Sequence, residues 1–303
     1  MKTTSSLRIV IFYGLCLALT LTASCSVLHP TQLTAVESLC ERVDTLSFLP
    51  QRVLQMIANN RQERNLYFTA TLITPQLRVA QLNDMVDFQI KEEKMIKRYL
   101  SYSDVLRSYF LALKRLCAPT RYEQYGVELR GVGRSLDSLI HYYNELEGEQ
   151  VLPEGYAKLR GKVLGFGAEA YVRRKQAVYV RDYVQLADTL VGMYCDSLAV
   201  MIAGPQLKEW IEHEKVELAT EYALYLQLCT PLSGREEDRF YLEKRRQLKD
   251  CETLLRKGKT ALTSLKKAHH KLALSLKKRC AIDQIYPEIL EFNKLIHQLV
   301  EVF

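Results

Sequence analysis

The apolar residues of this chain recur at alternating steps of three and four over long stretches, and this spacing constrains the fold most. The longest such seam runs over residues 241–276, and others cover 122–146, 177–201 and 285–303. Such steps keep one stripe on one face of an α-helix, as in coiled coils and long antiparallel bundles. No long stretch has the period of two that a half-buried strand requires. The sequence therefore predicts an all-α protein.

The expected helices are long because helix-breaking residues are sparse. The chain has only 13 glycines and 8 prolines among 303 residues, which favours helices over strands and turns. The prolines of the mature chain fall between the periodic runs, where they suit helix ends. We expect an elongated antiparallel helical bundle with coiled-coil-like helices over residues 31–47, 51–63, 76–117, 120–147, 154–203, 206–229, 235–279 and 286–302.

The first 24 residues differ in kind from the rest and indicate export. Lys2 and Arg8 make a positive end, and the apolar run 9–21 follows it. That run is shorter than the roughly 20 apolar residues of a membrane span. Small residues then precede Cys25, as at a signal-peptidase site. We therefore expect residues 1–24 to be a removed signal peptide.

The run Leu21-Thr22-Ala23-Ser24-Cys25 resembles the lipobox of bacterial lipoproteins, in a relaxed form similar to that of Bacteroidetes. The resemblance implies that Cys25 is acylated and becomes the first residue, which anchors the chain in a membrane through lipid. Ser26 is not the aspartate that retains enteric lipoproteins at the inner membrane, and no acidic cluster follows. The resemblance thus implies the periplasmic face of the outer membrane. The alternative is an ordinary cleaved signal with an incidental cysteine.

The chain therefore divides into three parts. Residues 1–24 form the signal, residues 25–33 the anchor and a short tether, and residues 34–303 the helical bundle. The bundle has a candidate division into two sub-bundles, 34–150 and 151–303.

One segment, 253–280, concentrates positive charge without an acidic residue. The functional interpretation is a face that binds an anionic lipid, a polysaccharide or another polyanion. The alternative, which we favour, is a solvated face or one paired with acidic side chains of neighbouring helices. Nucleic acid is an improbable partner because no known nucleic-acid-binding motif accompanies the charge. The basic residues are Arg256, Lys257, Lys259, Lys266, Lys267, Lys271, Lys277, Lys278 and Arg279.

The mature chain has six cysteines besides Cys25, and they are widely spaced. An even number in an exported protein permits disulfides, but spacing alone leaves many connectivities open. If helices 154–203, 206–229 and 235–279 run antiparallel through tight turns, Cys195 and Cys251 lie at similar heights, both roughly 24 Å from the 230–234 turn. They are the candidate disulfide. The alternative is that most cysteines are buried free thiols.

Motifs of catalysis and cofactor binding are missing from the sequence. It has no His-Glu-x-x-His, no Gly-x-Ser-x-Gly and no glycine-rich phosphate loop. Glu212-His213-Glu214 beside Glu217 reads as a solvated helix face rather than a metal site. We therefore expect no enzyme activity, no cofactor and no metal.

Three functions remain open. The favoured one is a lipid-anchored, non-enzymatic scaffold, adaptor or binding subunit with a protein partner in the envelope. The second is a carrier or adhesin that binds an anionic lipid or polyanion through the 253–280 segment. The third is a membrane-remodelling or pore-forming helical protein, for which 178–203 is the nearest apolar segment, although its charged residues make insertion costly.

Overall fold

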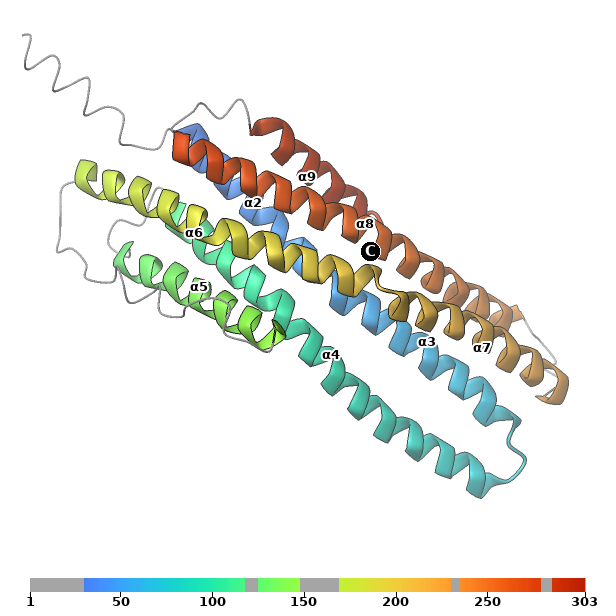
Figure 1. The fold of residues 1–303 in the computed structure, drawn as a ribbon. Helices are drawn as coiled ribbons and strands as arrows, with labels where there is room; N and C mark the ends of the chain where they lie inside the picture. Colours follow the sequence, from blue (N-terminus) through green and yellow to red (C-terminus); the bar gives the residue numbers. More distant parts are fainter. Residues whose placement is uncertain (1–29, 118–124, 148–168, 230–234, 279–284, 303) are drawn as a thin grey trace, which may run out of the picture.

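The computed structural model describes residues 30–117, 125–147, 169–229, 235–278 and 285–302, and within these ranges every regular element is an α-helix. The prediction of an elongated, antiparallel all-α bundle is confirmed (Figure 1). The helices are α2 (Pro30–Ser47), α3 (Leu49–Thr71), α4 (Pro75–Cys117), α5 (Tyr125–Glu147), α6 (Glu169–Ala203), α7 (Pro205–Cys229), α8 (Arg235–Lys278) and α9 (Tyr286–Val300).

Within the described residues the helix bounds agree closely with the sequence prediction except in α3, which the sequence ends at residue 63 and the structure at Thr71. The predicted starts of the helices at residues 120 and 154 lie outside the described residues. The run from Asn59 to Asn65 is largely polar and hides the apolar periodicity. Tyr67 continues the apolar periodicity beyond this run, and the centre of its ring lies 5.0 Å from that of Tyr222 on α7. Packing against a neighbouring helix therefore extends α3 beyond the point that local pattern indicates.

Two pairs of helices lie end to end and act as two long, broken rods. In the first, α2 is followed directly by α3, and α4 runs back along both (Figure 1). Lys114 of α4 pairs with Glu41 on α2 at 2.8 Å, and Glu92 of α4 pairs with Arg61 on α3 at 2.8 Å. The partner number on α4 falls as the number on α2 and α3 rises, so one antiparallel register spans the break.

The second rod is α6 followed by α7, and α8 runs back along both. Asp196 on α6 pairs with Lys266 at 2.5 Å, whereas Tyr222 on α7 donates to Asp238. At 1.5 Å per residue, the 60 residues of α6 and α7 extend over about 90 Å. The tight antiparallel turn at residues 203–206, on which the candidate Cys195–Cys251 disulfide depended, is therefore not formed. A Gly204-Pro205 pair breaks the hydrogen-bond ladder whether the chain turns or continues, so the sequence alone did not distinguish the two.

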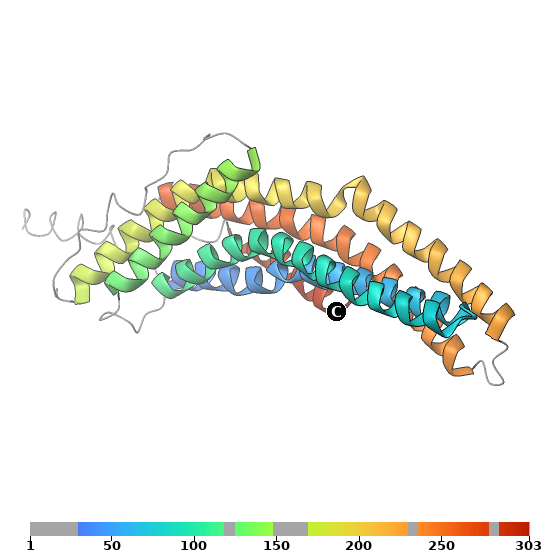
Figure 2. The same ribbon diagram turned by 90° about the horizontal axis from the view of Figure 1, so that it is seen from below.

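One continuous core joins the two rods, and Figure 2 shows the bundle bowed along its length. Its largest fully buried side chains include Tyr109, Tyr194, Phe110 and Phe292, which come from α4, α6 and α9. The candidate division between residues 150 and 151 falls outside the described residues.

Candidate functional site

The first half of α4 contacts the rest of the bundle along one side only. Between Pro75 and Lys94, only Gln81, Met85 and Glu92 are even half-buried. Met85 lies against Thr69, and Glu92 pairs with Arg61, so the contacted side faces α3. The other sides carry large apolar groups that are about half exposed: Leu77, Val79, Leu82, Val86, Phe88 and Ile90.

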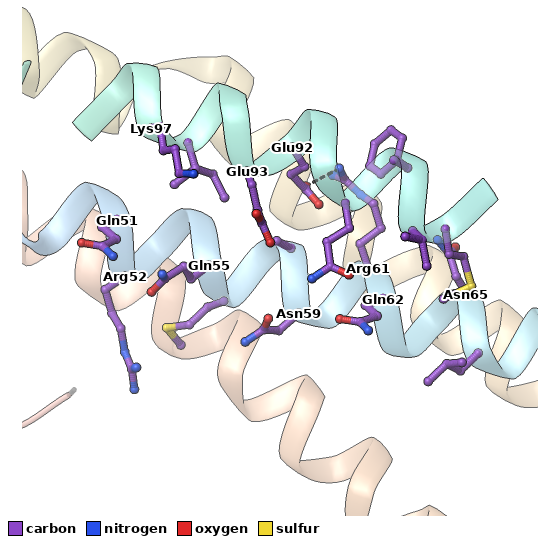
Figure 3. Close-up of a pocket in the computed structure, with 18 of the residues that line it drawn as sticks. Gln51, Arg52, Gln55, Asn59, Arg61, Gln62, Asn65, Glu92, Glu93 and Lys97 are labelled. Carbon is purple, nitrogen blue, oxygen red and sulfur yellow. Dashed lines mark hydrogen bonds and ion pairs between the residues drawn. The ribbon is translucent and has the colours of Figure 1, made fainter. Parts of the chain in front are cut away.

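A groove of about 690 Å³ runs between α3 and this part of α4 (Figure 3). We call it the α3–α4 groove. Its α3 wall carries a row of carboxamides and its α4 wall carries apolar side chains. A carboxamide both donates and accepts hydrogen bonds, so the α3 wall suits polar groups of either kind. The row consists of Gln51, Gln55, Asn59, Gln62 and Asn65.

Arg61 ties the two walls of the groove to the core. Its Nε donates to Glu214 of α7 at 2.7 Å and its NH1 donates to Glu92 of α4 at 2.8 Å. Arg64 adds a contact to Glu214 at 3.2 Å, and the Glu214 side chain is only 2% exposed. Two arginines thus compensate one buried carboxylate, as a buried charge requires. The prediction that Glu214 lies on a solvated helix face is therefore wrong.

The groove also holds charged side chains beside its carboxamides and apolar groups. Burial raises the pKa of Glu92, although nearby Arg61 opposes this. Arg61 also lies over the Phe88 ring, 5.5 Å from its centre. Among the side chains that line the groove in the described structure, none is a serine, threonine, cysteine or histidine.

Three lysines of the basic segment of α8 pair with neighbouring helices. Lys266 meets Asp196 of α6 at 2.5 Å, and both Lys267 and Lys271 reach Glu288 of α9. Lys266 and Lys267 nevertheless remain exposed to solvent. Part of the basic segment is therefore paired with acidic side chains of neighbouring helices, as the alternative interpretation expected.

The remaining cations of the segment have different surroundings. Lys257 donates to the Gln298 carbonyl at 2.7 Å. Arg256, Lys259 and Lys277 are exposed and form no ion pair within the described part of the chain. The side chain of Lys278 and the whole of Arg279 lie outside the described residues, as does Cys25.

The candidate Cys195–Cys251 disulfide is not formed, and the helix register explains why. Both thiols are free and buried. Cys195 lies beside Asp196, which pairs with Lys266, whereas Cys251 lies 15 residues away from Lys266 along α8. That distance is about 22 Å, far beyond the roughly 4.4–6.8 Å between the Cα atoms of a disulfide. The Cys251 thiol faces the Val53 carbonyl of α3 instead, at 4.0 Å.

A buried polar chain links α4, α8 and α6 in the core. The carboxylate of Asp188 lies 3.2 Å from His269 Nδ1 and 2.7 Å from His270 Nδ1. The Nδ1 atoms of both histidines donate to the carboxylate, because an ionised carboxylate only accepts hydrogen bonds. His269 is fully buried, and its Nε2 lies 3.2 Å from the Tyr109 hydroxyl. The tautomer of His269 that donates from Nδ1 to Asp188 accepts from the Tyr109 hydroxyl at Nε2, which satisfies all three groups.

Two further properties bear on the open functions. No group of three or more His, Cys, Asp or Glu side chains in the described residues is placed to hold a metal ion. The run Ala177–Cys229 is long and apolar enough to cross a membrane by length and composition, yet 44% of its most apolar window is buried inside the bundle. A core helix of a water-soluble bundle has the same properties.

Comparison with known proteins adds no relative. The chain matches no protein-family model, no curated protein and no solved structure. The function of the chain is therefore inferred from its own residues.

The sequence alone did not predict the α3–α4 groove. The signal that would have found it is the amide row on α3 opposite an apolar stripe on α4.

Proposed function

We propose that this chain is a lipid-anchored, non-enzymatic binding subunit of the cell envelope, which presents the α3–α4 groove to a helix of a partner protein. Lipid at Cys25 would tether one end of the bundle. Only four residues separate Cys25 from Pro30, where α2 begins, so the two positions lie at most about 18 Å apart. The α3–α4 connection lies at the opposite end of the molecule (Figure 1). The groove would therefore face away from the membrane.

The observation that carries the proposal is an unpartnered helical seam on α4. Val79, Leu82, Val86 and Ile90 follow steps of three and four, and their exposed fractions range from 41% to 57%. Leu82 and Val86 line the α3–α4 groove, and Val79 and Ile90 continue the same stripe beside it. A seam of this kind accepts an amphipathic helix in the manner of a coiled coil or a helix-in-groove complex. The carboxamides of α3 would bind polar groups along one edge of that helix.

Purification from native envelopes tests the proposal. Val86→Asp and Ile90→Asp would place carboxylates in the seam. Val216→Asp on α7 is the matched control, because Val216 is 62% exposed and lies outside the groove. We expect the partner to co-purify with the parent chain and with Val216→Asp, but not with the seam variants. Equal recovery with all four proteins would contradict the proposal.

The exposed cations of α8 favour a second candidate, a carrier or adhesin for an anionic lipid or polysaccharide. Lys277 lies at the end of α8 near the start of α2, whereas Arg256 is 21 residues, about 32 Å, further along the helix. A membrane could contact all of them only if the rod lies flat. Replacing Arg256, Lys259 and Lys277 with Glu should abolish salt-sensitive binding to anionic vesicles. Unchanged binding would eliminate this candidate.

The third candidate, a pore-forming protein, depends on the apolar run from α6 to α7. Release of this run would break the contacts of Asp188 and Asp196 with α8. Leakage of dye-loaded vesicles on addition of the protein would support it, and intact vesicles would count against it.

A further inference from the structure

The breaks in the two long rods lie at the same level of the bundle. The first is at Phe48, where Pro50 lacks the N–H that would continue the ladder from α2. The second is at Gly204-Pro205. Both lie against α8 at Gly258: a Cβ atom there would come within 2.0 Å of Leu49 and 3.2 Å of Ile202. Two axes thus change direction at one cross-section while α8 continues through it.

A cavity of about 280 Å³ lies between these breaks, because helix ends that change direction cannot pack as closely as continuous helices. Pro50 and Pro205 both line it. Its walls also include Val53, Leu54, Met201, Leu207 and Leu255, with Trp210 among them. The cavity opens to solvent on the side of Val200, which is 73% exposed, and Trp210, which is 37% exposed.

The lining of this cavity excludes most ligand classes. In the described structure it includes no charged side chain, and Gln206 is its one carboxamide. An ion or a sugar would lose its hydration there without compensating hydrogen bonds. An apolar cavity of about 150 Å³ is already enough to bind benzene, so this one holds a larger apolar group. The flexible Met201 side chain adapts to the shape of an occupant.

We propose that this cavity binds one aliphatic chain, with the polar end of the ligand at Gln206 and Trp210. An aliphatic chain gains from burial against the leucine and valine walls, at about 0.8 kcal/mol per methylene. The chain could come from a free fatty acid or from a lipid in a bilayer. The site lies on a different side of α3 from the α3–α4 groove, since none of its lining residues belongs to the groove. The two proposals therefore stand or fall separately.

Trp210 provides a direct probe because it is the one tryptophan in the sequence. Full-length protein carrying Cys25→Ser would be titrated with decanoic acid below its micelle concentration. We expect a saturable shift of tryptophan emission to shorter wavelength and a rise in Tm, since the ligand binds the folded state. Absence of both changes would overturn the proposal.

Leu54→Phe would fill the cavity from its wall, and Leu228→Phe is the matched control because Leu228 is 60% exposed and outside the cavity. We expect decanoic acid to bind at least tenfold more weakly to Leu54→Phe and equally well to the control. If Leu54→Phe does not fold, Val200→Phe at the exposed opening replaces it, with the same expectation. Unchanged affinity in the folded variant would overturn the proposal.

Phosphatidylglycerol vesicles distinguish the two sources of the chain. A response to decanoic acid supports the cavity as a site for a free chain, and a further response to vesicles that Leu54→Phe also weakens supports capture of a lipid chain. A response to vesicles alone would show that Trp210 merely touches a membrane surface. That result would overturn the proposal.

Discussion

Leu49 occupies the space that a side chain on Gly258 would need: its Cδ2 atom lies 2.0 Å from the position of a Cβ atom there. Leu49 is 1% exposed and begins α3 directly after the break in the first rod. The missing side chain at 258 therefore lets the start of α3 pack closely on α8. This contact fixes the level at which both rods change direction.

Gly258→Ala should consequently destabilise the protein. Overpacking costs about 1–3 kcal/mol, and the better helix propensity of alanine returns about 1 kcal/mol. We expect a net loss of up to about 2 kcal/mol in the free energy of unfolding, measured with urea. Gly131→Ala on α5 is the control, because a Cβ atom there meets nothing within 4 Å, and it should stabilise the fold. Adding Leu49→Ala should relieve the clash, so additive losses would contradict this account.

The free energy of unfolding should depend on pH in the acidic range because of Asp188. Burial alone would raise the pKa of Asp188, but hydrogen bonds from His269 and His270 outweigh it and lower the pKa below 3.8. The stabilising contribution is therefore complete above that value and is lost as the pH falls through the lowered pKa. We expect Asp188→Asn to cost about 1–3 kcal/mol at pH 7 and progressively less below pH 4. A difference between the two proteins that stays constant down to pH 2 would show that the histidines do not hold the charge.

The buried cysteines should be protected from alkylation in the folded protein. Burial raises the pKa of Cys195 and of Cys251 to about 12, so both thiols remain protonated at neutral pH. Iodoacetamide at pH 8 should modify Cys229, which is half-buried, well before these two. All three should react after unfolding without a reductant. A Cys195–Cys251 peptide linked by a disulfide in that digest would contradict the register of α6 and α8.

Intact-mass measurement tests the anchor. Protein extracted from membranes should lack residues 1–24 and carry additional acyl mass on Cys25. Cys25→Ala should move the protein from the membrane fraction to the soluble fraction. If Cys25→Ala still fractionates with membranes, lipid at this position is not the anchor.

The sequence predicted the helices well because apolar steps of three and four record which face of a helix is buried. It did not predict how consecutive helices continue. Gly204-Pro205 breaks a helix but does not say whether the chain reverses, and only contacts such as Asp196 with Lys266 and Tyr222 with Asp238 settle it. The candidate disulfide was wrong for this reason.

The α3–α4 groove was harder still to predict, because the sequence does not show whether another helix packs over this part of α4. Val79, Leu82, Val86 and Ile90 have the spacing of a core-facing stripe, and in a sequence they resemble any buried seam. Glu214 shows the converse: it stands between other charged residues in the sequence, yet two arginines of α3 hold it inside the bundle.

Photo-crosslinking in intact cells tests the central claim most directly. A photoreactive residue placed at Val86 lies in the α3–α4 groove, and one at Val216 lies on α7 outside it. The account predicts one discrete protein adduct from Val86, whose crosslinked peptide carries apolar residues at steps of three and four, and no adduct from Val216. No adduct from Val86, or the same adducts from both positions, would contradict it.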